Sequence, residues 1–194
     1  LKPVLKVRFY IVTALSISIC VALFAAVLPS RVVEAQAEVK LSSLEVALWP
    51  EYNRPNVLVI YHLILSADVN LPADLVLLIP AQAGEPNEVA VRDVNGGLYS
   101  IAYKRTVNGE WSKLSFTATM PEIQVEYYDP RLEKQDDQRH FEYYWPGDYS
   151  VDSLTVEVQQ PLGALEMQIT PDLGLGSQGA DGLVYYTSQV GSLV

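Results

Sequence analysis

From residue 39 onward, hydrophobic and polar residues alternate in short runs that turn residues interrupt. Leu44, Val46 and Leu48 occupy every second position, and Pro50 closes that run. The run from Asn56 to Ser66 is apolar at consecutive positions, which is typical of a central strand buried on both faces. No helical period persists over several turns, so the pattern predicts strands throughout this part of the chain.

Further strands are expected at intervals of about 8–15 residues, with Pro or Gly in most of the gaps. Asn95-Gly96 and Asn108-Gly109 predict two hairpins, because glycine readily adopts the positive φ that tight turns need. The fold class predicted is all-β, an antiparallel β-sandwich. A charged segment near 129–139 interrupts the strand pattern, so the sequence is compatible with one sandwich or with two small ones. The remaining predicted strands are 75–79, 89–93, 98–104, 111–119, 123–128, 141–145, 154–159, 165–170 and 183–187.

A different pattern covers Phe9–Leu28, which contains no charged residue, Gly or Pro. A helix of that length rises about 30 Å, the thickness of the hydrocarbon core of a bilayer. Lys2, Lys6 and Arg8 precede it, so the positive-inside rule places the N-terminus in the cytoplasm and the rest outside the cell membrane. We therefore expect a cytoplasmic tail (1–8), a single transmembrane helix (9–28), a stalk (29–38) and an extracytoplasmic β region (39–194), periplasmic or on the cell surface.

Two other interpretations of this segment are a cleaved signal peptide, with Ala35–Ala37 as the cleavage site, and a lipoprotein modified at Cys20. The length of the apolar run favours an uncleaved anchor. Small residues recur every fourth position on one helix face and predict close packing against a second membrane helix. These residues are Ala14, Ser18, Ala22 and Ala26.

Charge and cysteine content narrow the range of functions that the chain could have. All 23 acidic residues lie at Glu34 or later, where only nine Lys and Arg occur, so the exported part carries a formal charge near −14. That charge argues against nucleic acid and anionic membrane surfaces, which attract basic proteins. The single cysteine lies in the membrane segment, so a hydrophobic core, without disulfides, is expected to hold the domain.

The sequence contains no pattern that specifies catalysis or a cofactor. The G-x-G-x-x-G letters at 174–179 follow Pro171 and Asp172 and lack the strand-to-helix context of a dinucleotide site. His62 and His140 are the only histidines, too few for a zinc or copper site. An acidic loop, with Asp129, Asp136 and neighbouring carboxylates, leaves calcium binding open. We expect no enzyme activity, no metal and no cofactor.

Aromatic residues concentrate between 127 and 149. About half of the aromatic residues on alternating strands face outward, and exposed Tyr and Trp favour protein interfaces or sugar stacking, while a core role accounts for the others. The candidate interface residues are Tyr127, Tyr128, Tyr143, Tyr144, Trp145 and Tyr149.

Four stretches of the sequence resemble a family, namely 44–61 (LEVALWPEYNRPNVLVIY), 126–130 (EYYDP), 145–149 (WPGDY) and 158–161 (VQQP). It is an uncharacterised family of membrane-anchored, exported β-domain proteins of filamentous green non-sulfur bacteria and their relatives. No activity or catalytic residue is assigned to it, so none is transferred here. Related sequences usually continue beyond the equivalent of Val194, which implies a longer chain with a possible second anchor.

These observations favour a non-catalytic, single-pass accessory subunit of a bacterial membrane protein complex. Its expected partners are the lipid bilayer and other subunits, contacted through the membrane helix and the β region. The resemblance implies that the host is a respiratory or photosynthetic electron-transfer complex. The alternative is a surface-anchored module that binds polysaccharide or peptide through the aromatic residues. A hydrolase with paired carboxylates has less support, since it rests only on the abundance of acids.

Overall fold

The computed structural model describes residues 39–146 and 149–193. The chain from Ala37 to Val194 forms one compact unit, which includes the charged segment near 129–139. Its regular secondary structure is almost entirely strand, as predicted. In the described part of the chain the only helical element is a 3₁₀ turn, η1 (Ala81–Ala83). No helix within that part is long and apolar enough to cross a membrane, and the predicted anchor at 9–28 lies outside it.

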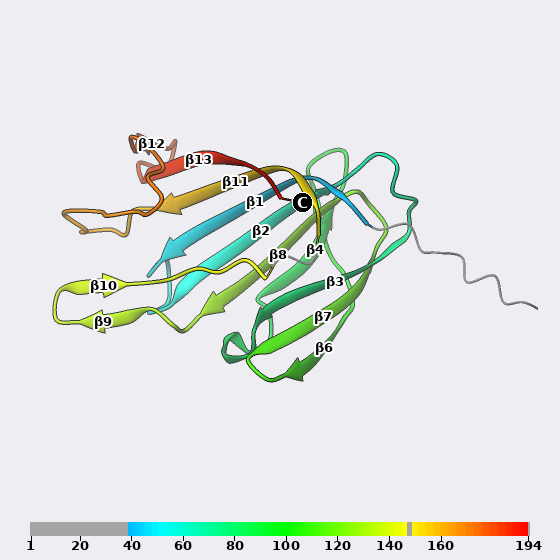
Figure 1. The fold of residues 1–194 in the computed structure, drawn as a ribbon, viewed down its shortest axis with the longest axis horizontal. Coiled ribbons are helices and arrows are strands. Elements are labelled where there is room, and N and C mark those ends of the chain that lie inside the picture. The colour runs from blue at the N-terminus through cyan, green and yellow to red at the C-terminus, as the bar shows by residue number, and fades with distance from the viewer. Residues whose placement is uncertain (1–38, 147–148, 194) are drawn as a thin grey trace, which may run out of the picture. The chain divides into compact units, whose positions relative to one another are not determined.

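The strands form a large sheet, a smaller sheet and a short hairpin (Figure 1). The eight-stranded sheet has the order β12 (Ser177–Gln178), β13 (Val184–Leu193), β11 (Val151–Gln159), β1 (Leu41–Pro50), β2 (Val57–Leu65), β8 (Glu122–Asp129), β4 (Glu88–Arg92) and β5 (Leu98–Ser100). The three-stranded sheet has the order β3 (Ala73–Pro80), β7 (Trp111–Ala118) and β6 (Tyr103–Asn108). The hairpin pairs β9 (Glu133–Gln135) with β10 (Gln138–His140).

One hydrophobic core unites the two sheets. On the large sheet, alternate residues of β1, β2, β4 and β8 are buried, because successive side chains of a strand point to opposite faces. On the small sheet, alternate residues of β3 and β7 join the same cluster. The members with no exposed surface at all are Leu41, Leu44, Val57, Val59, Ile79, Leu114, Ala118, Ile123 and Val125.

Both predicted hairpins are confirmed. The Asn95-Gly96 turn joins β4 to β5, and the Asn108-Gly109 turn joins β6 to β7, each as antiparallel neighbours. Gly96 has a φ of 86° and Gly109 a φ of 60°, a region that costs other residues steric energy. The local turn chemistry therefore sets the register of these two strand pairs.

One pairing departs from the expected antiparallel arrangement. Strand β11 lies parallel to β1, with Leu44 opposite Leu154 and Leu48 opposite Val158. Parallel neighbours need a long connection, and residues 51–150 separate β1 from β11 along the chain. The segment 141–145, predicted as a strand, belongs to this connection and has no strand partner. Its alternating Phe141, Tyr143 and Trp145 pack against the core, which explains a strand-like pattern without a strand.

Two further strand predictions need correction. The run 98–104 is divided at Ile101-Ala102, because β5 belongs to the large sheet and β6 to the small one. The run 165–170 forms no strand, and Leu165 is 96% exposed, so its apolar residues do not mark a core element.

Inside the core, three tyrosine hydroxyls form a short chain. The Tyr61 and Tyr127 hydroxyl oxygens are 2.8 Å apart, and the Tyr143 hydroxyl donates to that of Tyr61 over 3.0 Å. Trp145 packs edge-on against the Tyr61 ring, with centroids 5.1 Å apart. Burial raises the pKa of all three hydroxyls well above the ordinary value. The chain satisfies polar groups that would otherwise be costly to bury.

Asp129, at the end of β8, lies in the same region and is fully buried. Both Nε and Nη2 of Arg131 approach its carboxylate, Nε at 2.9 and 3.1 Å from the two oxygens, and the Arg131 amide donates over 3.0 Å. The carboxylate holds the pKa of the Arg131 guanidinium above its ordinary value, through hydrogen bonding and charge. We call these two residues with Tyr61, Tyr127 and Tyr143 the inner cluster.

Candidate functional site

The face of the large sheet that points away from the core carries a connected group of polar side chains. We call it the outer face. Because side chains alternate along a strand, this face follows directly from the core positions and the strand register. It comprises Ser43, Glu45, Ala47 and Trp49 of β1; Leu58, Ile60, His62 and Ile64 of β2; Glu122, Gln124, Glu126 and Tyr128 of β8; Glu88, Ala90 and Arg92 of β4; Thr155, Glu157 and Gln159 of β11; and Tyr185, Thr187 and Gln189 of β13.

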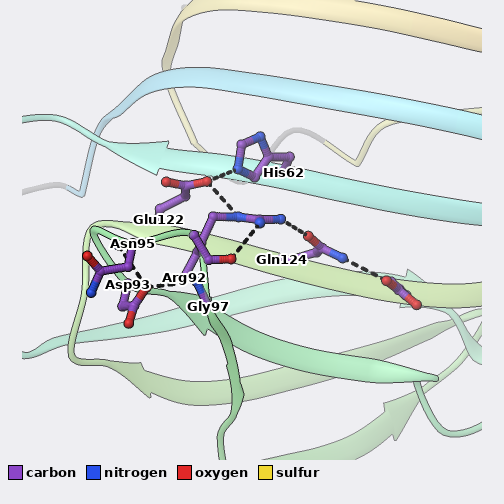
Figure 2. A network of polar contacts seen from close by, with 9 residues as sticks. His62, Arg92, Asp93, Asn95, Gly97, Glu122 and Gln124 are labelled. Atoms are coloured by element: carbon purple, nitrogen blue, oxygen red, sulfur yellow. Dashed lines mark hydrogen bonds and ion pairs between the residues drawn. The ribbon is translucent and has the colours of Figure 1, made fainter. Parts of the chain in front are cut away.

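At one end of the outer face, Glu122 joins residues from two neighbouring strands (Figure 2). Its Oε1 lies 2.6 Å from Nε2 of His62 on β2 and 2.9 Å from Nε of Arg92 on β4. The three side chains are 29–31% exposed, so they are partly shielded but still reach solvent. One carboxylate therefore orients an imidazole and a guanidinium on the same surface.

The contacts continue along β8 as a connected set. Arg92 Nη2 donates to Gln124 Oε1 over 2.8 Å, and Gln124 Nε2 donates to Glu126 Oε1 over 2.7 Å. Asn87 Nδ2 donates to the second oxygen of Glu126 over 2.9 Å. We call His62, Arg92, Glu122, Gln124, Glu126 and Asn87 the polar network. Each member restricts the rotamers of the next, so the surface is held in a fixed arrangement.

The Asn95-Gly96 turn supports the network from one side (Figure 2). Arg92 Nη1 donates to the Gly96 carbonyl over 3.1 Å. The Asp93 carboxylate accepts the amides of Asn95 and Gly97 over 2.9 and 2.7 Å, which stabilises the turn. These backbone donors, Gly97 first, hold the pKa of Asp93 below its ordinary value. The turn thus positions Arg92 as well as joining two strands.

The outer face carries more acidic than basic side chains. Among the strand residues of the outer face, five glutamates outweigh one arginine, Arg92, and Arg54 of the loop after β1 adds a positive charge over Tyr128. The glutamates are Glu45, Glu88, Glu122, Glu126 and Glu157. Within the described part of the chain, no Ser, Thr or Cys side chain hydrogen-bonds to His62. The His62–Glu122 pair therefore lacks an adjacent nucleophile of the kind that a catalytic triad requires.

The opposite end of the outer face is aromatic. The ring centroid of Trp49 lies 5.0 Å from that of Tyr52 and 6.1 Å from that of Tyr185, with interplanar angles of 57° and 62°. We call these three residues the aromatic group. Beside it, Trp49 Nε1 donates to Glu157 Oε1 over 3.1 Å. Burial raises the pKa of the Glu157 carboxyl above its ordinary value, against the opposing effect of that hydrogen bond.

Sequence reasoning missed the aromatic group, although one signal was present. Leu44, Val46 and Leu48 point into the core, so the period of two already places Trp49 on the other face. Tyr185 lies two strands away, and only the parallel pairing of β1 with β11 brings it close. That pairing is a long-range feature that no local pattern predicts.

The six aromatic residues proposed as an interface do not share a surface. Tyr127 is 1% exposed and belongs to the core, which corrects its assignment as an interface residue, while Tyr143, Trp145 and Tyr149 pack against the core. Tyr149 also accepts the amide of Val76 over 2.8 Å through its hydroxyl. Tyr128 lies on the outer face, and Tyr144 is 65% exposed near Trp111.

Other residues singled out from the sequence fall in two groups. Ala14, Ser18, Ala22 and Ala26 lie outside the described residues. Of the acids considered for calcium, Asp129 is paired with Arg131 in the core. Within residues 39–146 and 149–193, no three His, Cys, Asp or Glu side chains come together in a way that could hold a metal ion.

Comparison with known proteins adds little to this picture. No protein-family model and no curated protein matches the sequence. A solved structure of a candidate protease from Parabacteroides distasonis is similar at a TM-score of 0.40 and 9% sequence identity. That similarity covers 82% of this chain and 36% of the other, so this chain spans about a third of that protein. A likeness this weak carries no argument about function.

Proposed function

We propose that this protein is a non-catalytic, single-pass accessory subunit of a bacterial membrane protein complex. In this proposal, residues 9–28 anchor the chain and the β-domain lies on the extracytoplasmic side. The polar network of the outer face docks on a positively charged surface of a larger subunit. The resemblance to exported proteins of filamentous green non-sulfur bacteria makes a respiratory or photosynthetic electron-transfer complex the preferred host.

The observation that carries the docking proposal is the fixed, acid-rich arrangement on β2, β8 and β4. Glu88 and Glu126 are direct neighbours across β4 and β8, so two carboxylates lie side by side on the outer face. Like charges opposite each other destabilise a sheet, and a cationic partner would relieve that cost. Complementary charge also accelerates association and selects the partner. The hydrogen bonds to Glu126 hold its carboxylate in place before binding, which lowers the entropic cost of docking.

The test is co-purification of the tagged full chain from its native membrane after mild detergent extraction, with identification of the recovered chains by mass spectrometry. We expect a stoichiometric set of larger subunits. The double variant Glu88→Lys, Glu126→Lys should lose most of that set. A matched variant, Glu110→Lys with Glu133→Lys, makes the same charge change at exposed positions off the outer face and should keep it. Recovery of a lone chain, or equal yields from both variants, contradicts the docking proposal.

The membrane contribution is tested separately. We propose that Ala14, Ser18, Ala22 and Ala26 pack against a neighbouring membrane helix. Ser18→Leu with Ala22→Leu should then reduce the yield of complex, because overpacking costs about 1–3 kcal/mol per site. Membrane insertion should survive, since leucine inserts readily. An unchanged yield would mean that the β-domain makes the attachment alone.

A further inference from the structure

The aromatic group lies at the end of the outer face away from His62 and Glu122, and the proposed docking does not use it. Tyr52 is 49% exposed, and Trp49 and Tyr185 are partly exposed, so part of each ring reaches solvent. The rings are tilted rather than stacked, with Trp49 in contact with both tyrosines. Three aromatic residues that meet from β1, β13 and the loop after β1 and still reach solvent form a candidate ligand-binding surface.

The polar atoms of Trp49 and Tyr185 are already paired within the protein. The indole N–H of Trp49 donates to Glu157, and the Tyr185 hydroxyl donates to Asp181 Oδ2 over 2.6 Å. Gln159 Nε2 donates to the same hydroxyl over 3.1 Å. What the site offers a ligand is therefore aromatic surface bordered by the acceptor oxygens of Glu157 and Asp181. The donors of Trp49 and Tyr185 are both engaged with these carboxylates.

We propose that the aromatic group binds a neutral polysaccharide, whose sugar rings stack on Trp49 and Tyr52 while their hydroxyls donate to Glu157 and Asp181. A pyranose presents C–H groups on its flat faces and O–H donors around its edge, which matches this combination of ring surface and acceptors. A proline-rich peptide is the other ligand that docks on exposed aromatic residues. Its carbonyls need donors, and beside the aromatic group the donors of Trp49 and Tyr185 are occupied.

The strand register indicates how a chain of sugars would lie. A line across the sheet runs through Tyr185, Gln159, Trp49, Leu58 and Tyr128, one from each of five adjacent strands. The three aromatic residues on this line are partly exposed, whereas Gln159 and Leu58 between them are buried. Four strand spacings amount to about 19 Å, enough for several sugar units. The polysaccharide would thus cross the strands rather than follow them.

The far end of this line differs from the aromatic group. The guanidinium carbon of Arg54 lies 4.3 Å from the Tyr128 ring centroid, and the Tyr128 hydroxyl donates to Asn53 over 2.7 Å. Arg54 covers the ring and provides N–H donors for sugar oxygens. The two carboxylates at the aromatic end repel uronate and sulfate groups, so we restrict the proposal to neutral polysaccharides.

The experiment measures retention of the full chain, in a detergent without a sugar headgroup, on amorphous cellulose, xylan, mannan and polygalacturonate. We expect binding to at least one neutral polymer and none to polygalacturonate. Trp49→Ala should weaken binding about tenfold or more, as expected for an aromatic anchor. Trp49→Phe, which keeps a ring, should retain much of it. Tyr52→Ala, in an exposed loop where folding is not at stake, should weaken it severalfold.

The matched control is Trp111→Ala, because Trp111 is also partly exposed but lies on β7 of the small sheet. It should bind as the unaltered protein does. Circular dichroism and thermal unfolding verify that each variant is folded. Binding by Glu88→Lys, Glu126→Lys should be unchanged, which separates this proposal from the docking proposal. Absence of binding to all three neutral polymers, or binding that survives both Trp49→Ala and Tyr52→Ala, overturns the proposal.

Discussion

The two faces of the large sheet each carry a connected set of polar side chains, in opposite surroundings. On the core side, the inner cluster joins Asp129, Arg131 and three tyrosines, and Asp129 and Tyr61 are at most 1% exposed. On the outer face, the side chains of Glu122, His62 and Arg92 are 29–31% exposed. The hydrogen bonds and ion pairs of the two sets have similar lengths. The two sets differ in whether water can hydrate a polar group that has lost its partner.

Water can hydrate an orphaned group on the outer face but cannot reach one in the core. An unpaired buried polar group keeps its full desolvation cost, whereas an exposed ion pair contributes little net stability. The inner cluster should therefore determine folding, while the polar network remains free to serve binding. Substitutions on the two faces test this division directly.

The largest effect is expected from Arg131→Met, which leaves the buried carboxylate of Asp129 without its guanidinium. Breaking such a pair costs about 3–5 kcal/mol of unfolding free energy. Urea unfolding of the full chain in detergent at neutral pH measures it. Arg139→Met is the matched control, because its side chain is 36% exposed against 35% for Arg131, while its partner Glu51 is 29% exposed. A similar loss for both arginines would show that burial of the carboxylate is not decisive.

A smaller loss is expected from Tyr61→Phe, which removes one hydroxyl from the inner cluster and keeps the ring. The hydroxyls of Tyr127 and Tyr143 then lose a shared partner, at a cost of about 1–3 kcal/mol. Tyr99→Phe removes a hydroxyl that donates to Asp93 on a side chain that is 55% exposed, and it should change stability by less than about 0.5 kcal/mol. Equal effects in thermal or urea unfolding would contradict the comparison.

On the outer face, Glu122→Gln removes a carboxylate charge that contacts both Arg92 and His62. We expect a loss of at most about 1 kcal/mol, because exposed ion pairs are weak. The loss should shrink in high salt, which screens surface charges. A stability loss as large as that of Arg131→Met would show that the polar network holds the fold together.

Local patterns predicted much of this molecule. The alternation of Leu44, Val46 and Leu48 correctly indicates a strand with one buried face, and the Asn-Gly pairs correctly indicate hairpins. These features depend on neighbours in sequence. The alternation at 141–145 wrongly predicted a strand. Its aromatic residues pack on the core, but the segment pairs with no strand. Side-chain burial and strand pairing produce the same pattern, so sequence alone does not separate them.

The arrangement of the sites depends on long-range pairing, which the sequence does not display. Glu122 lies 30 residues from Arg92 along the chain, and only the pairing of β4 with β8 makes them neighbours. The sequence places Asp129 in an acidic loop that could bind calcium, and an aspartate is rarely fully buried. Arg131, two residues later, makes its burial tolerable. The core position of a charged residue follows from its partner rather than from its own type.

The smallest effect, opposite in sign, is expected from Glu157→Gln on the outer face. Burial raises the pKa of Glu157 in the folded state, so folding disfavours its charged form. The wild type then loses stability as the pH rises through that pKa, and the glutamine variant does not. At neutral pH the variant should be more stable by a few tenths of a kcal/mol, within the range of partly exposed sites. Its amide oxygen can still accept the Trp49 N–H. Well below the unfolded-state pKa both side chains are neutral, and the difference should vanish. Thermal unfolding of both proteins across this pH range measures the effect. A variant that is less stable at neutral pH would show that the hydrogen bond from Trp49 to the carboxylate outweighs the cost of burying the charge.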